Sequence, residues 1–207
     1  MQIGTNNTIH DTAIIELGAV LGDNNYIGEH TIVRAGVIIG NNNYIGANCN
    51  IGDRAEKVGA KDLPTTKVRI GDNNTLYKSI TIDSGTIHNT FIGDNCTLLK
   101  GAHLGHDAKV FKNVTLGCNV SIGGFTVVGE WSNFGLNSST HPREMIPKGT
   151  MLGANSFFKA GFTEDDEELI SSLEFNTWVG MPAKAIKVNE KGLEKYKKNK
   201  NYNNGKM

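Results

Sequence analysis

A six-residue repeat runs through most of the chain. Aliphatic residues occupy Ile3 and then every sixth position up to Ile51, and the same spacing returns at Ile70 and again from Ile92 to Phe158. A small residue stands four positions after most of them. An α-helix repeats near every 3.6 residues and a half-buried strand every 2, so a period of six fits neither alone. It predicts short strands joined by tight corners, with the aliphatic and the small residue pointing into a narrow interior.

The sequence of the repeat, as in L-G-D-N-N-Y-I-G-E and I-G-N-N-N-Y-I-G-A, resembles the hexapeptide repeat of the left-handed parallel β-helix family. The resemblance implies an all-β solenoid in which three hexapeptides make one triangular turn. Residues 18 apart should then stack at the ~4.8 Å spacing of neighbouring strands. We therefore expect residues 1–160 to form a left-handed β-helix domain. Asn7, Asn25 and Asn43, spaced by 18, should form an asparagine ladder along one corner.

Two segments and a tail break the repeat. Ile51 and Ile70 are 19 residues apart, one more than a whole turn, which predicts that residues 53–69 replace a coil with a projecting loop that contacts a ligand or a neighbour. A second slip adds four residues before Ile92. Residues 161–207 should form a C-terminal extension, in which N-E-K-G-L-E-K-Y-K-K-N-K predicts a short lysine-rich helix and N-Y-N-N-G-K-M a flexible end.

Charge and hydropathy narrow the classes of partner. The chain has 21 basic and 21 acidic residues, so its formal net charge of zero gives no general attraction to nucleic acid. The first residues, MQIGTNNTIH, have neither the basic nor the apolar region of a signal peptide, and no run approaches the ~18 apolar residues of a membrane span. We expect a cytoplasmic protein with no nucleic-acid partner and no membrane span.

The stretch A-H-L-G-H-D-A-K-V places two histidines three positions apart, with an aspartate after the second. Leu104 is in the inward phase, so His106 and Asp107 should face outward at the next corner. Gly124 lies one turn on, and His141 precedes the next position of that column. Acyl transfer needs a base for the attacking group, and neutral histidine, with a reference pKa of ~6.5, suits that role. An unobstructed glycine N–H suits the carbonyl oxygen as it becomes anionic.

The segment N-C-T-L-L-K-G-A-H-L-G-H-D-A-K-V resembles the N-x-L-L-x-x-x-H-x-x-H-D run of the UDP-N-acetylglucosamine O-acyltransferases of lipid A biosynthesis. Upstream, I-G-D-N-N-T-L-Y-K-S-I-T-I-D-S-G-T is similar to the family's I-G-D-x-N-x-I-R-E-x-V-T-I-H-R-G-T. The resemblance implies that His106 is the general base and Gly124 the oxyanion glycine. It also implies substrate contacts from Asp107 and His103, and places His141 near the acyl donor.

The chain departs from this family at several places. Asp83 and Ser84 stand where the family has His-Arg, although Asp83 remains a candidate substrate contact, and Phe125 replaces a histidine. The loop lacks the family's Q-D-L-K sequence. The family also has a C-terminal helical domain that docks the acyl carrier protein, and the sequence after Phe158 contains no counterpart of it. Instead, W-V-G-M-P-A-K-A-I-K resembles the closing segment of hexapeptide acetyltransferases that use acetyl-CoA. That resemblance implies acetyl-CoA as the donor, with Lys184 as a contact for it.

The leading interpretation is an acetyl-CoA-dependent acyltransferase acting on an amino or hydroxyl group of a nucleotide-linked sugar, in cell-surface polysaccharide biosynthesis. The resemblance implies a homotrimer with sites between neighbouring β-helices, and no metal is expected. One alternative is the acyl-carrier-protein-dependent UDP-N-acetylglucosamine O-acyltransferase itself. Two others are a γ-type carbonic anhydrase, which binds zinc through three histidines, and a non-catalytic β-helical scaffold.

Overall fold

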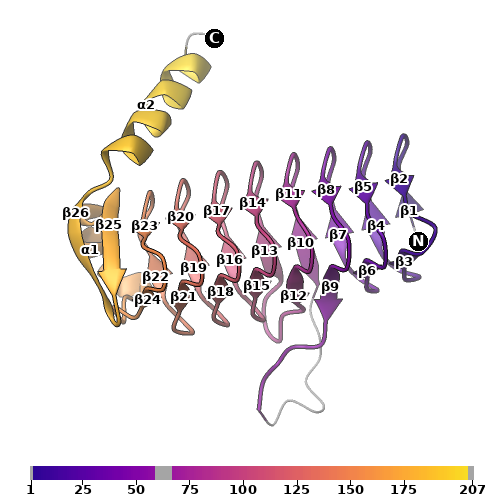
Figure 1. Ribbon diagram of the computed structural model, residues 1–207, viewed down its shortest axis with the longest axis horizontal. Coiled ribbons are helices and arrows are strands. Elements are labelled where there is room, and N and C mark those ends of the chain that lie inside the picture. Colours follow the sequence, from indigo (N-terminus) through magenta and orange to yellow (C-terminus); the bar gives the residue numbers. More distant parts are fainter. Residues whose placement is uncertain (1, 59–66, 205–207) are drawn as a thin grey trace.

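The computed structural model describes residues 2–58 and 67–204. Short parallel strands stack into a straight solenoid, with β1 at one end and the last strands and helices at the other (Figure 1). Three sheets form the faces of the solenoid, and the chain visits them in turn.

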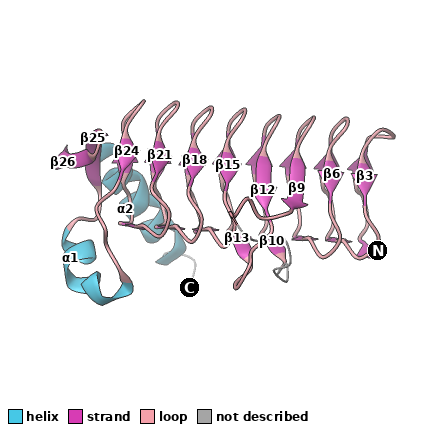
Figure 2. Ribbon diagram, turned by 90° about the horizontal axis from the view of Figure 1, so that it is seen from below, coloured by secondary structure: helices cyan, strands magenta, loops and turns pink. Residues whose placement is uncertain are grey.

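The strands of the first sheet are β1 (Gln2–Ile3), β4 (Val20–Leu21), β7 (Ile38–Ile39), β10 (Val68–Ile70), β13 (Thr90–Ile92), β16 (Lys109–Val110), β19 (Val127–Val128) and β22 (Met145–Ile146). Those of the second are β2 (Thr8–Ile9), β5 (Tyr26–Ile27), β8 (Tyr44–Ile45), β11 (Thr75–Leu76), β14 (Thr97–Leu98), β17 (Thr115–Leu116), β20 (Asn133–Phe134), β23 (Met151–Leu152), β25 (Asn176–Gly180) and β26 (Ala183–Val188). The third, which faces the viewer in Figure 2, contains β3 (Ile14–Ile15), β6 (Ile32–Val33), β9 (Asn50–Asp53), β12 (Thr81–Asp83), β15 (His103–Leu104), β18 (Ser121–Ile122), β21 (Ser139–Thr140) and β24 (Phe157–Phe158). The helical segments are η1 (Glu164–Asp166), α1 (Glu167–Ser172) and α2 (Glu190–Asn204).

The observed register confirms the predicted parallel β-helix. Leu98 pairs with Leu116, and His103 pairs with Ser121, so residues 18 apart stack on neighbouring coils. The aliphatic positions of the repeat are buried from the second coil onward, whereas Ile3 in the first coil is 40% exposed. The small inward positions fill the rest of the interior, which makes one continuous hydrophobic core along the solenoid.

The predicted asparagine ladder is also confirmed. The backbone N–H of Asn25 donates to Asn7 Oδ1 at 2.8 Å, and that of Asn43 donates to Asn25 Oδ1 at 2.9 Å. The ladder continues across the first interruption, because Asn74 N–H donates to Asn43 Oδ1 and Cys96 N–H to Asn74 Oδ1. Each amide oxygen thus satisfies a corner N–H that the sheets leave unpaired.

The expectation that the loop replaces a coil is wrong. Ile39 pairs directly with Ile70, and Ile51 pairs directly with Ile82, so no coil is missing. The additional residues are inserted at one corner, between β9 on the third sheet and β10 on the first. The four-residue slip between β12 and β13 falls at the same edge of the solenoid. Residues 59–66 of the predicted loop 53–69 lie outside the described residues.

An additional hairpin, which the repeat could not predict, closes the C-terminal end of the core. β25 continues the second sheet by pairing with β23, and β26 pairs with β25 in antiparallel direction (Figure 1). Trp178 is buried, with its ring centroid 4.9 Å from that of Phe158. The expected lysine-rich helix is present as α2, where Lys148 Nζ lies 3.9 Å from the ring centroid of Tyr196. The flexible end expected from residue 201 onward starts later, because residues 201–204 belong to α2, and residues 205–207 lie outside the described part of the chain.

None of the helices in the described segments has both the length and the apolar character needed to cross a membrane.

Replacing one inward aliphatic residue should destabilise the whole solenoid. We expect Leu98→Ala to lower the free energy of unfolding by about 2–5 kcal/mol, because Leu98 is fully buried and its loss leaves a cavity. Thr97→Ala, at the outward position of the same strand, should change it by less than about 1 kcal/mol. Urea denaturation of both variants measures the difference. Equal losses would contradict the inward assignment of the repeat.

Candidate functional site

An open pocket with a volume of about 390 Å³ lies along the edge between the third and first sheets. Its walls come from the corners that follow β15, β18 and β21, together with residues of the loop after β9. Four predicted site residues line it, namely Asp83, His103, His106 and Gly124. Both interruptions of the repeat therefore lie on the edge of the solenoid that carries the candidate site.

His106 and Asp107 form a hydrogen-bonded pair on this edge. His106 Nδ1 lies 2.8 Å from Asp107 Oδ2, and the two side chains are 13% and 0% exposed. His106 Nε2 has no hydrogen-bond partner among the described residues, although the side chain reaches the pocket. A histidine held at one ring nitrogen by a buried carboxylate, with the other nitrogen open, has the arrangement of a general base.

Asp107 is fixed by the segment of the four-residue slip. Its carboxylate accepts hydrogen bonds from the backbone N–H groups of Thr86, Ile87 and His88 at 2.8, 2.8 and 2.6 Å, and from Thr86 Oγ1 at 2.9 Å. Burial acts to raise the pKa of Asp107, but the hydrogen bonds from His106 and from these N–H groups outweigh it. The pKa of the carboxyl therefore lies well below its usual value, and Asp107 is ionised. The slip thus forms the cradle that holds Asp107 against His106, a role the sequence did not reveal.

The depressed pKa of Asp107 makes the stability of the protein sensitive to acid. Since the unfolded carboxyl binds a proton more readily than the folded one, the stabilisation is complete above the unfolded pKa of ~3.9 and is lost as pH falls through the folded value. We expect the melting temperature of Asp107→Asn to fall less than that of the wild type between pH 5 and pH 2, the range in which the unfolded carboxyl takes up its proton. Asp11→Asn, which changes an exposed carboxylate, should keep the wild-type slope. Identical slopes for all three proteins would contradict this account.

Gly124 lies directly against the imidazole of His106. A β-carbon built on Gly124 would lie 2.8 Å from His106 Nε2 and 3.0 Å from Cε1, so any side chain here would displace the ring. Within the described residues, the Gly124 N–H donates no hydrogen bond, whereas the N–H of Gly123 donates to Thr140 Oγ1. The corner therefore offers a free N–H beside an open histidine nitrogen.

Phe125 forms an aromatic wall that the sequence did not predict. Its ring meets that of His106 edge to face, with centroids 5.2 Å apart, and the Arg143 guanidinium stacks on it at 4.2 Å. Phe125 and Arg143 both have positive φ, at 61° and 67°. Positive φ recurs at corners along the whole solenoid, as at Asn119 and Trp131, so it belongs to the tight turn itself. What distinguishes Phe125 and Arg143 is that both line the pocket.

The remaining predicted residues lie at three different places. His103 and Asp83 line the pocket from β15 and β12, and burial raises the pKa of Asp83, an effect that the hydrogen bond from the Glu56 N–H partly offsets. His141 is exposed, hydrogen-bonded through Nδ1 to the Pro142 carbonyl, and not among the described residues that line the pocket. Lys184 is exposed on β26, where it pairs with Val179 at the end of the solenoid. One chain therefore does not bring Lys184 to His106.

Comparisons with known families agree with the repeat. Residues 18–53 match the family described as "Bacterial transferase hexapeptide (six repeats)", and residues 88–118 match "Hexapeptide repeat of succinyl-transferase". The chain is 34% identical over 110 residues to an acyl-[acyl-carrier-protein]–UDP-N-acetylglucosamine O-acyltransferase from Burkholderia thailandensis, and equally to one from Burkholderia mallei. Each match covers 52% of this chain and 42% of the relative, so the chain spans less than half the length of the relatives it matches.

Solved structures extend the likeness over nearly the whole chain. A UDP-N-acetylglucosamine acyltransferase from Campylobacter jejuni has a TM-score of 0.84 at 23% identity, covering 94% of this chain and 73% of the other, which shows the fold. The UDP-N-acetylglucosamine O-acyltransferase from Moraxella catarrhalis has a TM-score of 0.64 at 27% identity, with coverages of 92% and 76%. The predicted resemblance to hexapeptide-repeat acyltransferases of this kind is therefore confirmed.

The prediction of acetyl-CoA as the acyl donor is wrong. The relatives from both Burkholderia species are named for an acyl-[acyl-carrier-protein] donor. The prediction depended on the V-G-M-P-A-K text, which in the structure forms the turn of the β25–β26 hairpin. With that donor removed, the assignment of Lys184 as a coenzyme A contact loses its basis.

Proposed function

We propose that this chain transfers an acyl group from acyl carrier protein to a sugar hydroxyl of UDP-N-acetylglucosamine or a close analogue. The observation that carries the proposal is the His106–Asp107 pair, with Gly124 packed against the imidazole in an open pocket. The names of the Burkholderia relatives support the donor and the acceptor class. In this proposal residues 1–160 form the acyltransferase domain, and residues 161–207 close its end.

His106 would act through Nε2. The imidazole takes the proton from the sugar hydroxyl as its oxygen attacks the thioester carbonyl, and the Gly124 N–H donates to the carbonyl oxygen as it becomes negative. The C–S bond then breaks, the imidazolium returns the proton to the departing thiolate, and the new C–O bond remains as an ester. Asp107, ionised and fixed, keeps Nδ1 protonated and favours the imidazolium between the two steps.

We also propose a homotrimer with each pocket covered by a neighbouring β-helix. Apolar side chains are exposed along the edge that carries the pocket, among them Leu17, Val58 and Ile87. Such side chains suit contact with a second copy of the chain. Sedimentation analysis should give three times the 22.4 kDa mass of one chain.

The proposed activity is tested with one panel of substrates. Acyl carrier protein loaded with short, medium and long acyl chains is mixed with UDP-N-acetylglucosamine or an analogue that carries an amino group in place of a sugar hydroxyl, and the released free thiol is followed. We expect release with at least one acyl chain and UDP-N-acetylglucosamine itself. Failure of every pair would favour a non-catalytic scaffold, and release only with the amino sugar would contradict transfer to oxygen.

A further inference from the structure

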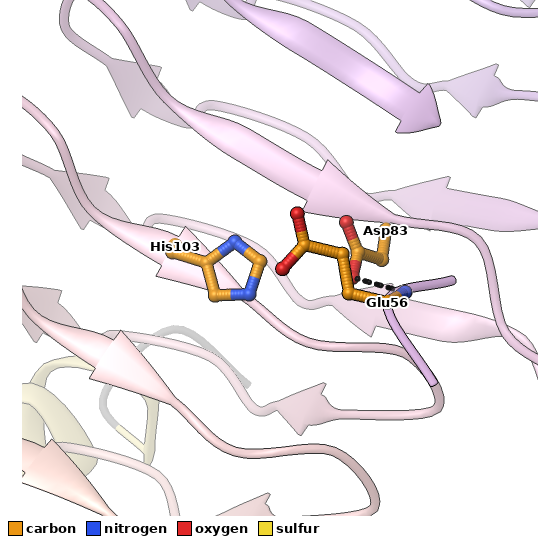
Figure 3. Close-up of side chains that lie close together, drawn as sticks. All are labelled: Glu56, Asp83 and His103. Atoms are coloured by element: carbon orange, nitrogen blue, oxygen red, sulfur yellow. Dashed lines mark hydrogen bonds between the residues drawn. The ribbon is translucent and has the colours of Figure 1, made fainter. Parts of the chain in front are cut away.

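The pocket contains a second group of polar side chains beside the His106–Asp107 pair. Glu56, Asp83 and His103 each place one potential ligand atom within 4.8 Å of the other two. Figure 3 shows the Glu56 carboxylate between the imidazole of His103 and the carboxyl group of Asp83. Asp83 lies 27 residues after Glu56 and 20 before His103, so no ligand spacing in the sequence could reveal the group.

Neither carboxylate of this group is paired with a lysine or arginine in the described part of the chain, although Lys57 and Arg143 line the same pocket. Asp83 is only 5% exposed, and among the described residues its carboxyl accepts a single hydrogen bond, from the Glu56 N–H at 3.2 Å. Neither Asp83 nor Glu56 forms an ion pair with a described residue. A buried carboxylate beside a second one is costly unless a cation accompanies it.

The imidazole of His103 is oriented toward this pair by a separate contact. His103 Nδ1 lies 2.8 Å from Thr81 Oγ1, on the neighbouring coil. When Nδ1 donates this hydrogen bond, the lone pair of Nε2 is free to bind a cation. Metal-binding histidines are commonly fixed in this way through their other ring nitrogen.

We propose that Glu56, Asp83 and His103 bind one Zn²⁺ ion on the wall of the pocket. Two carboxylate oxygens and an imidazole nitrogen are donors that zinc accepts, and three protein ligands leave a fourth position for water or a substrate oxygen. Bonds of about 2.0–2.2 Å require the three donor atoms to close in from their present separation, and the exposed side chain of Glu56 allows that movement. Mg²⁺, which takes oxygen ligands in octahedral geometry, suits this set poorly.

This site departs from the sequence-based expectation that no metal is needed. It lies in the same pocket as His106, but its occupancy does not depend on acyl transfer. A binding measurement therefore tests the metal site, whereas thiol release tests the proposed function.

The test is calorimetric titration of the 207-residue chain, without an affinity tag, with ZnCl₂ after removal of metal by a chelator. We expect one Zn²⁺ per chain, and affinities at least about tenfold weaker for Glu56→Gln, Asp83→Asn and His103→Gln. Thr81→Ala should weaken binding by about tenfold, because it releases His103 without removing a ligand. Asp53→Asn is the matched control. Asp53 is the strand partner of Asp83 on the neighbouring coil but is not one of the three proposed ligands, so this substitution should leave the affinity unchanged.

Melting curves of the metal-free variants serve as a control for folding. Because Glu56 lies on an exposed loop, Glu56→Gln still tests the proposal if a variant with a buried substitution does not fold. A chain that binds no Zn²⁺, or three ligand variants that bind it as the wild type does, would overturn the proposal. Equal affinities for Mg²⁺ and Zn²⁺ would overturn the assignment of the ion.

Discussion

Replacing His106 with alanine is expected to lower the rate of acyl transfer by about 10²–10⁴-fold, the range for removal of a general base. Among the described residues Nε2 has no hydrogen-bond partner, whereas Nδ1 is held by Asp107, so the substitution removes the proton acceptor and leaves the pocket in place. The melting temperature should remain close to that of the wild type, since Asp107 keeps its hydrogen bonds from Thr86, Ile87 and His88. Thiol release from acyl carrier protein in the presence of UDP-N-acetylglucosamine measures the rate.

Two further variants show whether the loss belongs to this histidine alone. His10→Ala changes a histidine on another edge of the solenoid and should leave the rate unchanged. Asp107→Asn keeps the shape of the side chain but not its charge, so it should lower the rate less than His106→Ala does. Wild-type turnover in His106→Ala would rule out His106 as the base, and an equal loss in His10→Ala would point to a general effect of substitution.

The core of the solenoid could be predicted almost completely from the sequence. A period of six fixes which residues point inward, and a turn of 18 fixes which ones stack, as Leu98 on Leu116 shows. Both follow from local geometry that repeats along the chain. The neighbourhood of His106 and Gly124 was predictable for the same reason, because it needs only the register between two adjacent corners.

The insertions could not be placed in the same way. An interval of 19 residues between Ile51 and Ile70 fits a replaced coil as well as an enlarged corner, and only the pairing of Ile39 with Ile70 distinguishes them. The position of Glu56 over Asp83 depends on that distinction. The sequence did contain a signal for the segment that holds Asp107, since the slip at residues 87–91 lies about one turn before Asp107.

The error over the acyl donor has a structural cause. The V-G-M-P-A-K text lies in the β25–β26 hairpin, in which Trp178 and Ala183 are buried against the last coil. A solenoid must cover its last coil, whatever reaction it catalyses. Closure of the core therefore accounts for this segment without reference to the donor.

Replacing Gly124 with alanine is expected to lower the rate of acyl transfer by about 10²-fold or more with little loss of stability. The added β-carbon would lie 2.8 Å from His106 Nε2, so the imidazole must turn away from the position that Asp107 holds. The atoms it meets are the far end of a side chain, which can move. The matched substitution is Gly105→Ala, whose β-carbon would meet the backbone atoms Gly124 N at 2.9 Å and Ile122 O at 3.1 Å.

Backbone atoms of a neighbouring coil cannot move in this way, so Gly105→Ala should lower the melting temperature clearly more than Gly124→Ala does. A double-mutant cycle identifies the cause of the lost activity, because two substitutions acting through one imidazole are not additive. In the His106→Ala background, Gly124→Ala should therefore lower the residual rate only slightly. Full additivity of the two losses would show that Gly124 acts independently of His106, and the contact between them would then not explain the requirement for glycine.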